Sequence, residues 1–468
     1  MQTNSAPGFI WILWCTTDNC DETYSMAGPP LDPVETDDAL PSRVDVAIIG
    51  GGIIGMSTAL ALIQKGLSVV VCEKGHVAGE QSSRNWGWCR VSRRDPREIP
   101  LAVEAARIWQ GLNDLVQGET GFRQTGILFG CDSAKAIADA EEWLSRAKSF
   151  GLASRMIGPD EAAKVLRGAA RRLKGALYTP SDGRAEPQKA VPAIAKAVRR
   201  LGGTVVERCA ARAIDVAGGR VAGMITERGR VAADAVVLAG GAWSRLFALG
   251  QKLRLPQLKV QNTVVRTEPL EGGPEGAAWI GDFSFRRRLD GGYTLANGMN
   301  IIVPITPDSF QFAFDFLPAF LLEWRSLRLR LDKRFLQEWR DWRVTDPDEV
   351  SPFEKVRVLD PQPDVRAASA ALKAAQEFFP QFKKAKIAQQ WAGMIDATPD
   401  ALPVISGIDQ VPGFFIATGF SGHGFGIGPA AGRLCADLVT GATPIVNPTP
   451  FRFTRFSDGS RPRPTTGV

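Results

Sequence analysis

The stretch that decides the fold runs from residue 44 to residue 73 and reads VDVAIIGGGIIGMSTALALIQKGLSVVVCE. Its apolar start, 44–49, predicts a short buried strand, and residues 56–65 have the pattern of a helix. A second apolar run, 68–72, predicts another strand and is followed by an acid, Glu73. This order of strand, glycine turn, helix, strand and acid predicts the first unit of a Rossmann-like dinucleotide-binding domain.

The glycines between the first strand and the helix form a G-x-G-x-x-G pattern, and each has a physical role. Gly50 permits the tight turn, Gly52 lets the backbone approach a pyrophosphate, and Gly55 lets the helix pack close to the strand. The helix N-terminus offers free N–H groups and a partial positive charge to the phosphates. Glu73 stands where an acid can bind the ribose hydroxyls of an adenosine.

The segments that follow favour FAD over a nicotinamide cofactor. A nicotinamide domain usually continues directly into the next βαβ unit, whereas here an irregular polar run follows, GEQSSRNWG (79–87). Two later junctions of a strand with a turn are also rich in glycine, VVLAGGAWS (236–244) and FFIATGFSGHGFGIGP (414–429). After the second, a helical pattern runs from Ala430 to about Val439 but no further strand follows. This junction therefore predicts a loop laid against the flavin, not a second dinucleotide site.

Length and composition are those of an ordinary globular protein with two or three domains: 468 residues, 44% of them hydrophobic and 23% charged. The net charge is +6, but no Lys or Arg precedes Arg43, while seven acids do. Residues 1–42 are therefore predicted to form a flexible acidic extension. Its longest apolar run, Phe9–Cys15, is too short to span a membrane, and a membrane-touching tip at 9–14 is the alternative. The chain has no nucleic-acid-binding motif and no concentrated basic stripe, so we expect no nucleic-acid partner.

Histidine and cysteine usage limits the chemistry further. The two histidines, His76 and His423, cannot build a histidine-rich metal site, so no metal is expected. The seven cysteines include no C-x-x-C pair, which argues against a disulfide framework and favours a reduced, cytoplasmic compartment.

Six sequence blocks occur in the order found in a known family. They are AIIGGGIIG (47–55), SSRN (82–85), AGGAWS (239–244), WAG with TPD (391–393 and 398–400), PVI (403–405) and GFSGHGF (419–425). With these blocks the chain resembles the glycine/D-amino-acid oxidase (DAO) superfamily of FAD-dependent amine oxidoreductases. Members of that superfamily include glycine oxidase, sarcosine oxidase, D-amino-acid dehydrogenase and iminodiacetate oxidase. The resemblance covers roughly residues 44–441.

The resemblance implies an α/β fold in which a Rossmann-like FAD-binding domain is interleaved with an α+β substrate domain built on an antiparallel sheet. The expected division gives the FAD-binding domain 43–125, 180–255 and 390–455, the substrate domain 126–179 and 256–389, and a tail 456–468. Within the substrate domain, 254–265 and 291–302 have the pattern of strands. Residues 319–342 have the pattern of one long amphipathic helix rich in arginine.

The resemblance also implies which residues hold the cofactor. No cysteine lies near Thr398, so the covalent flavin link of sarcosine oxidases is expected to be absent and FAD to be bound non-covalently. The residues expected to bind it are Gly50, Gly52, Ile53, Ile54, Gly55, Glu73, Lys74, Gln81, Ser82, Ser83, Arg84, Asn85, Trp86, Gly87, Ala211, Gly240, Gly241, Trp243, Gly422, His423, Gly424, Phe425, Gly426 and Ile427.

The activity implied is oxidation of a primary or secondary amino acid, such as a D-amino acid, sarcosine or iminodiacetate. A hydride passes from the amine-bearing carbon to flavin N5, and the imine hydrolyses to a carbonyl acid and an amine. The partners would be a small anionic amine or amino acid and either O2 or an electron carrier, with the oligomeric state left open. The alternative is a flavin-carrying subunit of a larger complex, which would have no cation near the flavin.

A substrate carboxylate needs a cation, and arginine suits it best because its fork is bidentate. The block after Trp391 reads AGMID where glycine oxidases carry an arginine, and Gly426 stands where sarcosine oxidases place a lysine. The expected anchor is therefore Arg287 or Arg288, which precede a strand expected on the substrate side. A dicarboxylate substrate would explain such an arginine-rich entrance.

Other side chains are secondary candidates. Arg90 and Arg93 are the second choice for the carboxylate anchor. His423 is the third candidate catalytic residue, although a structural role in its turn is an equal alternative. Three tryptophans are candidates for the pocket wall, with a core position as the alternative for each: Trp86, Trp88 and Trp279.

Overall fold

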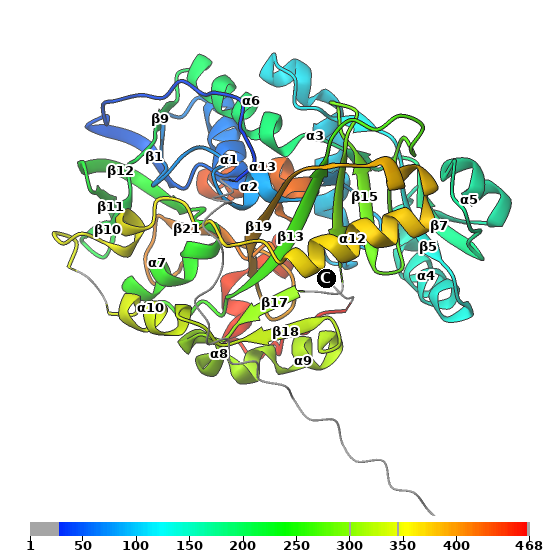
Figure 1. The fold of residues 1–468 in the computed structure, drawn as a ribbon. Coiled ribbons are helices and arrows are strands. Elements are labelled where there is room, and N and C mark those ends of the chain that lie inside the picture. The colour runs from blue at the N-terminus through cyan, green and yellow to red at the C-terminus, as the bar shows by residue number, and fades with distance from the viewer. Residues whose placement is uncertain (1–27, 299–300, 344–345, 466–468) are drawn as a thin grey trace, which may run out of the picture.

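The computed structural model describes residues 28–298, 301–343 and 346–465, and its architecture rests on two large sheets (Figure 1). The first sheet has eight strands, in the order β10-β11-β12-β1-β2-β9, with β21 beside β12 and β20 beside β21. Its strands are β1 (Arg43–Ile49), β2 (Val69–Cys72), β9 (Thr204–Val206), β10 (Ala211–Ala217), β11 (Arg220–Thr226), β12 (Gly229–Leu238), β20 (Val404–Gly407) and β21 (Phe414–Thr418).

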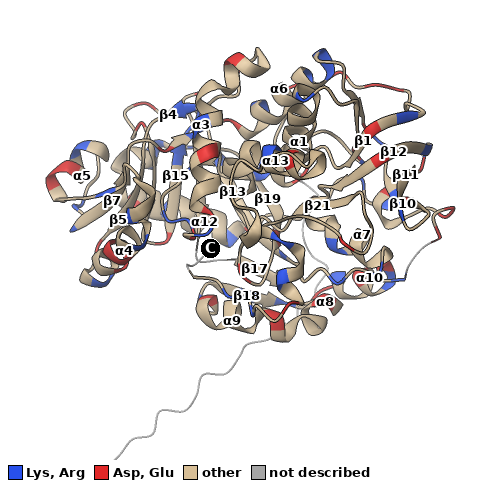
Figure 2. Ribbon diagram, turned by 180° about the vertical axis from the view of Figure 1, so that it is seen from behind, with Lys and Arg blue, Asp and Glu red and all other residues tan. Residues whose placement is uncertain are grey.

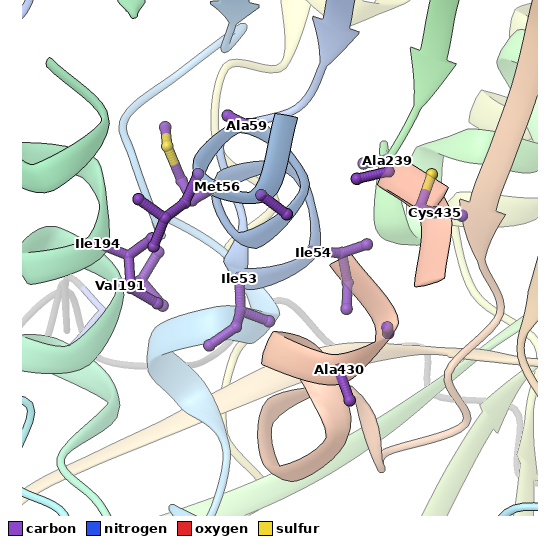
Figure 3. Close-up of a cluster of buried hydrophobic side chains, with 14 of the residues drawn as sticks. Ile53, Ile54, Met56, Ala59, Val191, Ile194, Ala239, Ala430 and Cys435 are labelled. Carbon is purple, nitrogen blue, oxygen red and sulfur yellow. The ribbon is translucent and has the colours of Figure 1, made fainter. Parts of the chain in front are cut away.

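The centre of the first sheet is parallel. Strand β1 pairs in parallel with β2 on one side and with β12 on the other, and β21 continues the parallel set beyond β12. All four residues of β2 are buried, as expected for a strand covered on both faces. The helices on one face are α1 (Ile53–Gln64), α3 (Ile99–Val116), α6 (Pro187–Arg200) and α13 (Gly424–Thr440). Figure 3 shows the apolar contacts that α1 makes there with α6 and α13.

The second sheet has ten strands in the order β18-β17-β13-β16-β15-β14-β5-β7-β6, with β19 also beside β13. Its strands are β5 (Ile127–Cys131), β6 (Arg155–Ile157), β7 (Gly175–Thr179), β13 (Leu258–Thr267), β14 (Ala277–Ile280), β15 (Phe283–Arg287), β16 (Tyr293–Asn297), β17 (Ile301–Pro304), β18 (Leu327–Arg330) and β19 (Ile387–Ala397). Most neighbours are antiparallel, and the exceptions are β14 with β5 and β17 with β18. Helix α12 (Val365–Phe378) packs on this sheet through a buried apolar cluster.

Strands of the two sheets alternate along the chain, as the interleaved architecture requires. A small third sheet joins β3 (Trp88–Cys89), β8 (Gly183–Arg184) and β4 (Arg123–Gln124). The remaining helices are α2 (Gln81–Arg84), α4 (Ala134–Ala147), α5 (Pro159–Val165), α7 (Ser244–Gly250), α8 (Pro307–Gln311), α9 (Ala313–Glu323), α10 (Arg334–Asp341) and α11 (Pro352–Lys355). The residue numbers proposed for the domain boundaries stay a prediction.

The elements of the decisive stretch form as expected, and the last helix differs in one respect. Helix α1 ends where Gly66, with a φ of +85°, leaves the helical conformation. Helix α13 begins at Gly424, six residues before the expected start at Ala430. Pro429 therefore lies inside the helix, where it offers no N–H for a helical hydrogen bond.

The single long helix predicted over 319–342 is wrong. The segment contains the end of α9, the strand β18 and the helix α10. Residues 327–330 read Leu-Arg-Leu-Arg, an alternation with the period of a strand, and they pair in parallel with β17. The division of this segment follows from that pairing.

The predicted free extension is also wrong for residues 28–42, which lie against the body of the protein. The N–H of Asp32 donates to the carbonyl of Gln188 at 3.1 Å, and the N–H of Asp37 donates to that of Val205 at 2.7 Å. The Asp37 carboxylate pairs with the Arg199 guanidinium at 3.0 Å. The acids of this segment therefore serve as partners for basic residues of the fold. Residues 1–27, including the proposed tip at 9–14, lie outside the described part.

The C-terminal segment also returns to the body. Arg455 is buried and pairs with Asp400 at 3.0 Å, and the Thr465 hydroxyl donates to the Asp95 carboxylate. Residues 456–465 are thus held against the fold instead of forming a free tail.

Throughout the described ranges, the helices are too short or too polar to cross a membrane.

Candidate active site

A cavity of about 400 Å³ is lined by residues of both sheets. On the side of the first sheet it is bordered by the glycine turns after β1, β12 and β21. On the side of the second sheet its lining is mostly apolar and comes mainly from strands β13, β14 and β17 and from the segment α9–β18. These apolar residues are Leu258, Val260, Val264, Trp279, Ile301, Val303, Phe316, Ala319, Phe320, Leu322, Leu327 and Leu329.

In the glycine turn after β1, the backbone segments lie so close together that a side chain would not fit. The absence of side chains leaves the turn open to a ligand. A Cβ on Gly50, which has a φ of +106°, would lie 2.5 Å from the carbonyl oxygen of Ala239. A Cβ on Gly55 would lie 2.0 Å from the carbonyl oxygen of Gly50. Gly55 is therefore needed for the contact of helix and turn and does not itself line the cavity, in agreement with its predicted packing role.

Glu73 is fixed at the end of β2 by two backbone hydrogen bonds. Its Oε2 accepts from the N–H of Gly51 at 2.7 Å, and its Oε1 accepts from the N–H of Gly75 at 2.8 Å. Burial raises the pKa of Glu73, while Lys74 and the two N–H groups act in the opposite direction. A carboxylate held beside a glycine turn fits the ribose-binding role of this position, so the residues present fit a dinucleotide.

The structure brings most of the predicted cofactor residues to the cavity. Those that line it are Gly50, Gly52, Ile53, Ile54, Glu73, Lys74, Gln81, Ser82, Arg84, Asn85, Trp86, Gly87, Ala211, Gly240, Gly241, Trp243, Gly422, His423, Gly424, Phe425 and Gly426. Gly55, Ser83 and Ile427 are buried behind this lining. The three candidate tryptophans, Trp86, Trp88 and Trp279, all line the cavity, and the rings of Trp86 and Trp279 are 5.2 Å apart.

The polar run after β2 is held in place by its own side chains. The Ser82 hydroxyl accepts from the N–H of Ile53, the first residue of α1, at 2.9 Å. Glu80 joins two further lining residues, because its carboxylate accepts from Lys74 Nζ at 2.6 Å and from Trp243 Nε1 at 3.0 Å. Lys74 Nζ also lies 4.4 Å from the centre of the Trp243 ring. The run therefore forms one connected wall of the cavity.

The glycine loop after β21 depends on Asp396, which the sequence did not single out. Its Oδ2 accepts from the N–H of Gly419 at 2.7 Å and from the Thr418 hydroxyl at 3.2 Å. Its backbone carbonyl accepts from the N–H of Ser421, which has a φ of +50°. Asp396 thus holds a loop in which a non-glycine residue adopts the left-handed conformation. A lone acid at the end of a strand carries no signal by which its partner could have been predicted.

Arg287 and Arg288 do not reach the cavity, so the structure does not support either as the carboxylate anchor. Arg287 pairs with Glu275 at 2.7 Å. Arg288 lies 3.2 Å from Asp290 and 3.7 Å from Glu186. The guanidinium groups of both arginines are therefore paired with acids, outside the lining of the cavity.

Arg286, the third member of that basic run, has a structural role. It is 1% exposed and binds Glu186 through two hydrogen bonds of 2.7 and 3.1 Å. Its Nε also donates to the carbonyl of Trp86 at 2.6 Å, which supports the turn at Trp86 and Gly87. Arg286 therefore supports two residues of the cavity lining, Trp86 and Gly87, without lining the cavity itself.

Besides Lys74, Arg84 and Arg357, the cations that line the cavity are Arg90 and Arg94, on the segment between β3 and α3. Arg90 was one of the two second-choice anchors, and the other, Arg93, is not part of the lining. The Arg93 guanidinium instead lies 5.7 Å from the centre of the Phe129 ring. Arg94 was not predicted, because nothing in the sequence separates it from its arginine neighbours.

Arg94, Glu98 and His423 form a buried charged cluster at the cavity. Glu98 Oε2 lies 3.3 Å from His423 Nδ1 and 3.6 Å from Arg94 Nε. The Arg94 Nε and Nη1, both Glu98 oxygens and His423 Nδ1 are buried and have no hydrogen-bond partner among the described residues. Buried polar atoms without partners are uncommon; Glu98 Oε2 and His423 Nδ1 face each other, whereas Arg94 lines the cavity, where a ligand can complete its hydrogen bonds.

The same cluster sets the ionisation of its members. Burial, helped by Arg94, lowers the pKa of His423 to about 4, although Glu98 acts against this. Burial alone would raise the pKa of Glu98, but His423 and Arg94 bring it below its usual value. At neutral pH, the cluster therefore contains a neutral imidazole and a carboxylate.

Asp182 stabilises the backbone next to Arg90. Its Oδ1 accepts from the N–H of Val91 at 2.8 Å, and its Oδ2 accepts from the N–H of Ser92 at 3.4 Å. Burial raises the pKa of Asp182 to about 6 despite these bonds and the nearby Arg90.

The described residues hold no group of His, Cys, Asp and Glu that could bind a metal ion.

Comparisons with known proteins agree with this geometry. The model of the family "FAD dependent oxidoreductase" (DAO) matches residues 45–438. Glycine oxidase of Pseudomonas putida is 27% identical over 419 residues, which are 87% of this chain and 97% of the relative.

Two solved structures of L-amino acid deaminases are also similar. The enzyme from Proteus myxofaciens, in complex with anthranilate, has a TM-score of 0.89 and 32% identity over 92% of this chain and 97% of its own. The enzyme from Proteus vulgaris has a TM-score of 0.87 and 31% identity over 90% of this chain and 100% of its own. The chain therefore belongs to the FAD dependent oxidoreductase (DAO) family and is a flavoenzyme that oxidises amino acids or amines.

Proposed function

We propose that this protein oxidises an α-amino acid with a large apolar side chain. The observation that carries the proposal is the division of the cavity between two kinds of lining. Arg90, Arg94 and His423 line it near the glycine loop after β21, whereas strands β13 and β17 and helix α9 supply a mostly apolar wall that also includes Asn262 and Glu323. An amino acid with a charged head and an apolar side chain matches both surfaces.

We assign the carboxylate of this substrate to Arg90. Its guanidinium is half-buried, lines the cavity, and donates to the carbonyl of Ser92, which leaves further N–H groups for a ligand. Burial lowers the pKa of Arg90 well below its usual range, and the neighbouring Arg94 acts in the same direction. A bound carboxylate would offset both effects. Arg94 is the weaker candidate because Glu98 already lies beside it.

His423 is assigned to orienting the substrate. With Nδ1 facing the Glu98 carboxylate, the neutral ring carries its proton on Nδ1, so Nε2 is left as a hydrogen-bond acceptor. A group with a pKa of about 4 is a weak base at neutral pH. The role of the imidazole is therefore to accept a hydrogen bond from the substrate ammonium or amine and not to carry away its proton.

FAD would be held by the turn at Gly50 and Gly52, by Glu73, and by the glycine loop that Asp396 supports. Bound FAD supplies the acceptor for the hydride that leaves the amine-bearing carbon. The protein contributes the anchored carboxylate, the orienting imidazole, and an apolar wall that excludes water from the reacting carbon. Non-covalent attachment of FAD stays a prediction.

The configuration of the substrate is proposed from the comparisons. The two structures that are 31% and 32% identical to this chain are named L-amino acid deaminases, and this favours an L-amino acid. The D-amino acids and N-substituted glycines expected from the sequence are alternatives. The dicarboxylate alternative loses its support, because Arg287 and Arg288 do not line the cavity. Arg90 and Arg94 in the lining also argue against a flavin carrier without substrate chemistry.

A panel of substrates matched in pairs tests the proposal. The rates of 2-oxo acid formation would be compared for L-leucine and D-leucine, L-phenylalanine and L-aspartate, and for sarcosine and iminodiacetate. We expect the L-enantiomers with apolar side chains to give the highest kcat/KM. Faster turnover of iminodiacetate or L-aspartate would contradict the match between the side chain and the apolar wall, and faster turnover of D-leucine would contradict the configuration.

A further inference from the structure

Residues 351–360, which we call the strap, consist of Ser351, helix α11 and the five residues that follow it. In the sequence they lie between β18 and β19, two strands of the second sheet, and in Figure 1 they belong to the yellow coil that leads into α12. Three strap residues nevertheless belong to the lining of the cavity: Phe353, Arg357 and Val358. None of the three is among the cofactor residues expected from the sequence.

The strap contacts the chain directly after β2, where the sequence predicts binding of the ribose. Lys74 Nζ donates to the carbonyls of Val356 and Arg357, both at 2.9 Å. In return, Arg357 Nη1 donates to the carbonyl of Lys74 at 3.1 Å. A Cβ on Gly75 would lie 2.2 Å from the carbonyl oxygen of Arg357, so the two backbones are in close contact. The strap therefore lies against the residues that follow Glu73.

Two ion pairs fasten the strap to the edge of the first sheet at β10 and β11, where residues of both charges are found (Figure 2). Glu354 accepts from Arg212 Nε and Nη2, both at 2.9 Å. Arg357 Nη2 donates to Glu227 Oε2 at 2.6 Å. Although burial acts in the opposite direction, Arg212 and Ser351 lower the pKa of Glu354 to about 2. The bidentate pair is therefore charged throughout the neutral pH range.

The inner side of the strap joins the wall that the polar run after β2 forms. Phe353 is 9% exposed, and its ring centre lies 5.9 Å from that of Trp243 and 6.0 Å from that of Phe247. The N–H of Leu359 donates at 2.9 Å to Glu80 Oε1, an oxygen that also accepts from Trp243. The strap is thus part of the cavity wall and not a surface loop beside it.

We propose that the strap is the outer wall of the adenosine end of the FAD site, and that FAD leaves only when the strap opens. Its hydrogen bonds are made to the residues after Glu73, the position that would bind the ribose. The pair of Arg212 and Glu354 holds it closed from outside the cavity, since neither residue belongs to the lining. A segment between two strands of the second sheet thus secures a cofactor bound by the first. The proposal does not depend on which amino acid is oxidised.

The rate at which FAD leaves the holoenzyme tests this role. The protein is diluted into buffer without FAD, and the flavin released at timed intervals is separated by ultrafiltration and measured by fluorescence. Arg212→Met and Glu354→Gln each break the charged bidentate pair and should speed release about 10- to 100-fold. The double variant should release FAD no faster than the single variants do, because both substitutions remove the same interaction.

Arg230→Met is the matched control. Arg230 pairs with Asp215 at 2.5 Å, and the two residues belong to β12 and β10 of the same sheet. This variant loses an arginine–carboxylate pair that does not include the strap, so it should release FAD at the wild-type rate.

Hydrogen exchange of the FAD-saturated proteins, followed by mass spectrometry, is an independent readout. In Arg212→Met and Glu354→Gln, peptides from residues 351–360 should exchange faster than in the wild type, because the strap opens more often. Peptides from β1 and α1 should keep their wild-type rates.

Three results would overturn the proposal. The first is release of FAD at the wild-type rate in both strap variants. The second is faster release without faster exchange in residues 351–360, which would separate the loss of FAD from opening of the strap. The third is faster release in Arg230→Met as well, with faster exchange throughout the first sheet, which would show a general loss of stability.

Discussion

Glu98 and His423 stand immediately before two different helices, α3 and α13, and their side chains meet with Glu98 Oε2 3.3 Å from His423 Nδ1. The carboxylate is fully buried, and it does not line the cavity, whereas the imidazole does. This arrangement makes Glu98 a positioning residue for the ring. The segment between β3 and α3 and the glycine loop after β21, which are far apart in the sequence, are linked through it.

Replacement of Glu98 by Gln should lower kcat by about 10- to 100-fold with a smaller change in KM, because misplacement of an orienting group affects the reacting geometry most. His423 stays neutral at pH 7 in both proteins, since loss of the Glu98 charge lowers the pKa of the ring further. Protonation of the ring therefore cannot explain a loss at that pH. Steady-state kinetics from pH 6 to pH 9 provide the check. Equal kcat values would show that the ring needs no carboxylate behind it.

Arg90→Met should raise KM for an apolar L-amino acid by about 10- to 100-fold, because a charge-assisted hydrogen bond to a carboxylate contributes about 1.5–3 kcal/mol. The flavin content should be unchanged. Arg287→Met is the matched control, since Arg287 is paired with Glu275 away from the lining. If Arg287→Met raised KM and Arg90→Met did not, the anchor would be the one first expected from the sequence.

Gly55→Ala should destabilise the protein and reduce its retention of FAD, because the new Cβ would lie 2.0 Å from the Gly50 carbonyl oxygen. Gly111→Ala is a suitable control, because Gly111 lies within helix α3 and an added Cβ would have no atom within 4 Å apart from the neighbouring backbone of its own helix. That substitution should raise stability by about 0.5–1 kcal/mol. Thermal unfolding and the ratio of flavin to protein absorbance test both effects. Normal FAD retention in Gly55→Ala would contradict the close contact of turn and helix.

The pH dependence of stability should contain two opposing contributions. The folded-state pKa of His423, about 4, lies below the usual 6.5, so the unfolded chain binds the proton more readily and stability falls as the pH decreases from 6.5 to 4. The folded-state pKa of Asp182, about 6, lies above the usual 3.8, so the native state binds the proton and stability falls as the pH increases from 4 to 6. At about 1.4 kcal/mol per pKa unit, each contribution is about 3 kcal/mol.

Single substitutions separate these contributions. Asp182→Asn should make stability rise more steeply between pH 4 and pH 6, and His423→Asn should make the rise shallower or reverse it. Chemical denaturation at a series of pH values measures the two slopes. Parallel curves for the wild type and both variants would show that neither group titrates in this range.

The parts of the fold that local sequence determines could be predicted. The turn at Gly50 and the acid Glu73 form a pattern of fixed spacing, and its residues reach the cavity as expected. Arg287 and Arg288 could not be placed in this way, because their partners are set by tertiary structure and Glu186 is about 100 residues away in the chain. The roles of Arg94 and Glu98 also could not be predicted, because they depend on His423, which the fold brings beside them at the start of α13.

One correction of the fold could have been predicted from a weaker signal. The alternation Leu-Arg-Leu-Arg at 327–330 already argues against one long helix. The packing of residues 28–42, in place of the expected flexible extension, could not be predicted because the sequence does not show the partners of their acids. Their partners, such as Arg199 for Asp37, lie on helix α6.

An anaerobic titration of the purified protein with L-phenylalanine, followed by its absorbance, tests the central claim most directly. The account predicts a protein whose oxidised flavin band at about 450 nm bleaches with L-phenylalanine. Wild type and Arg287→Met should bleach at similar concentrations, and Arg90→Met should need about 10- to 100-fold more. A flavin band that sarcosine or iminodiacetate bleaches and apolar L-amino acids leave unchanged would contradict the account.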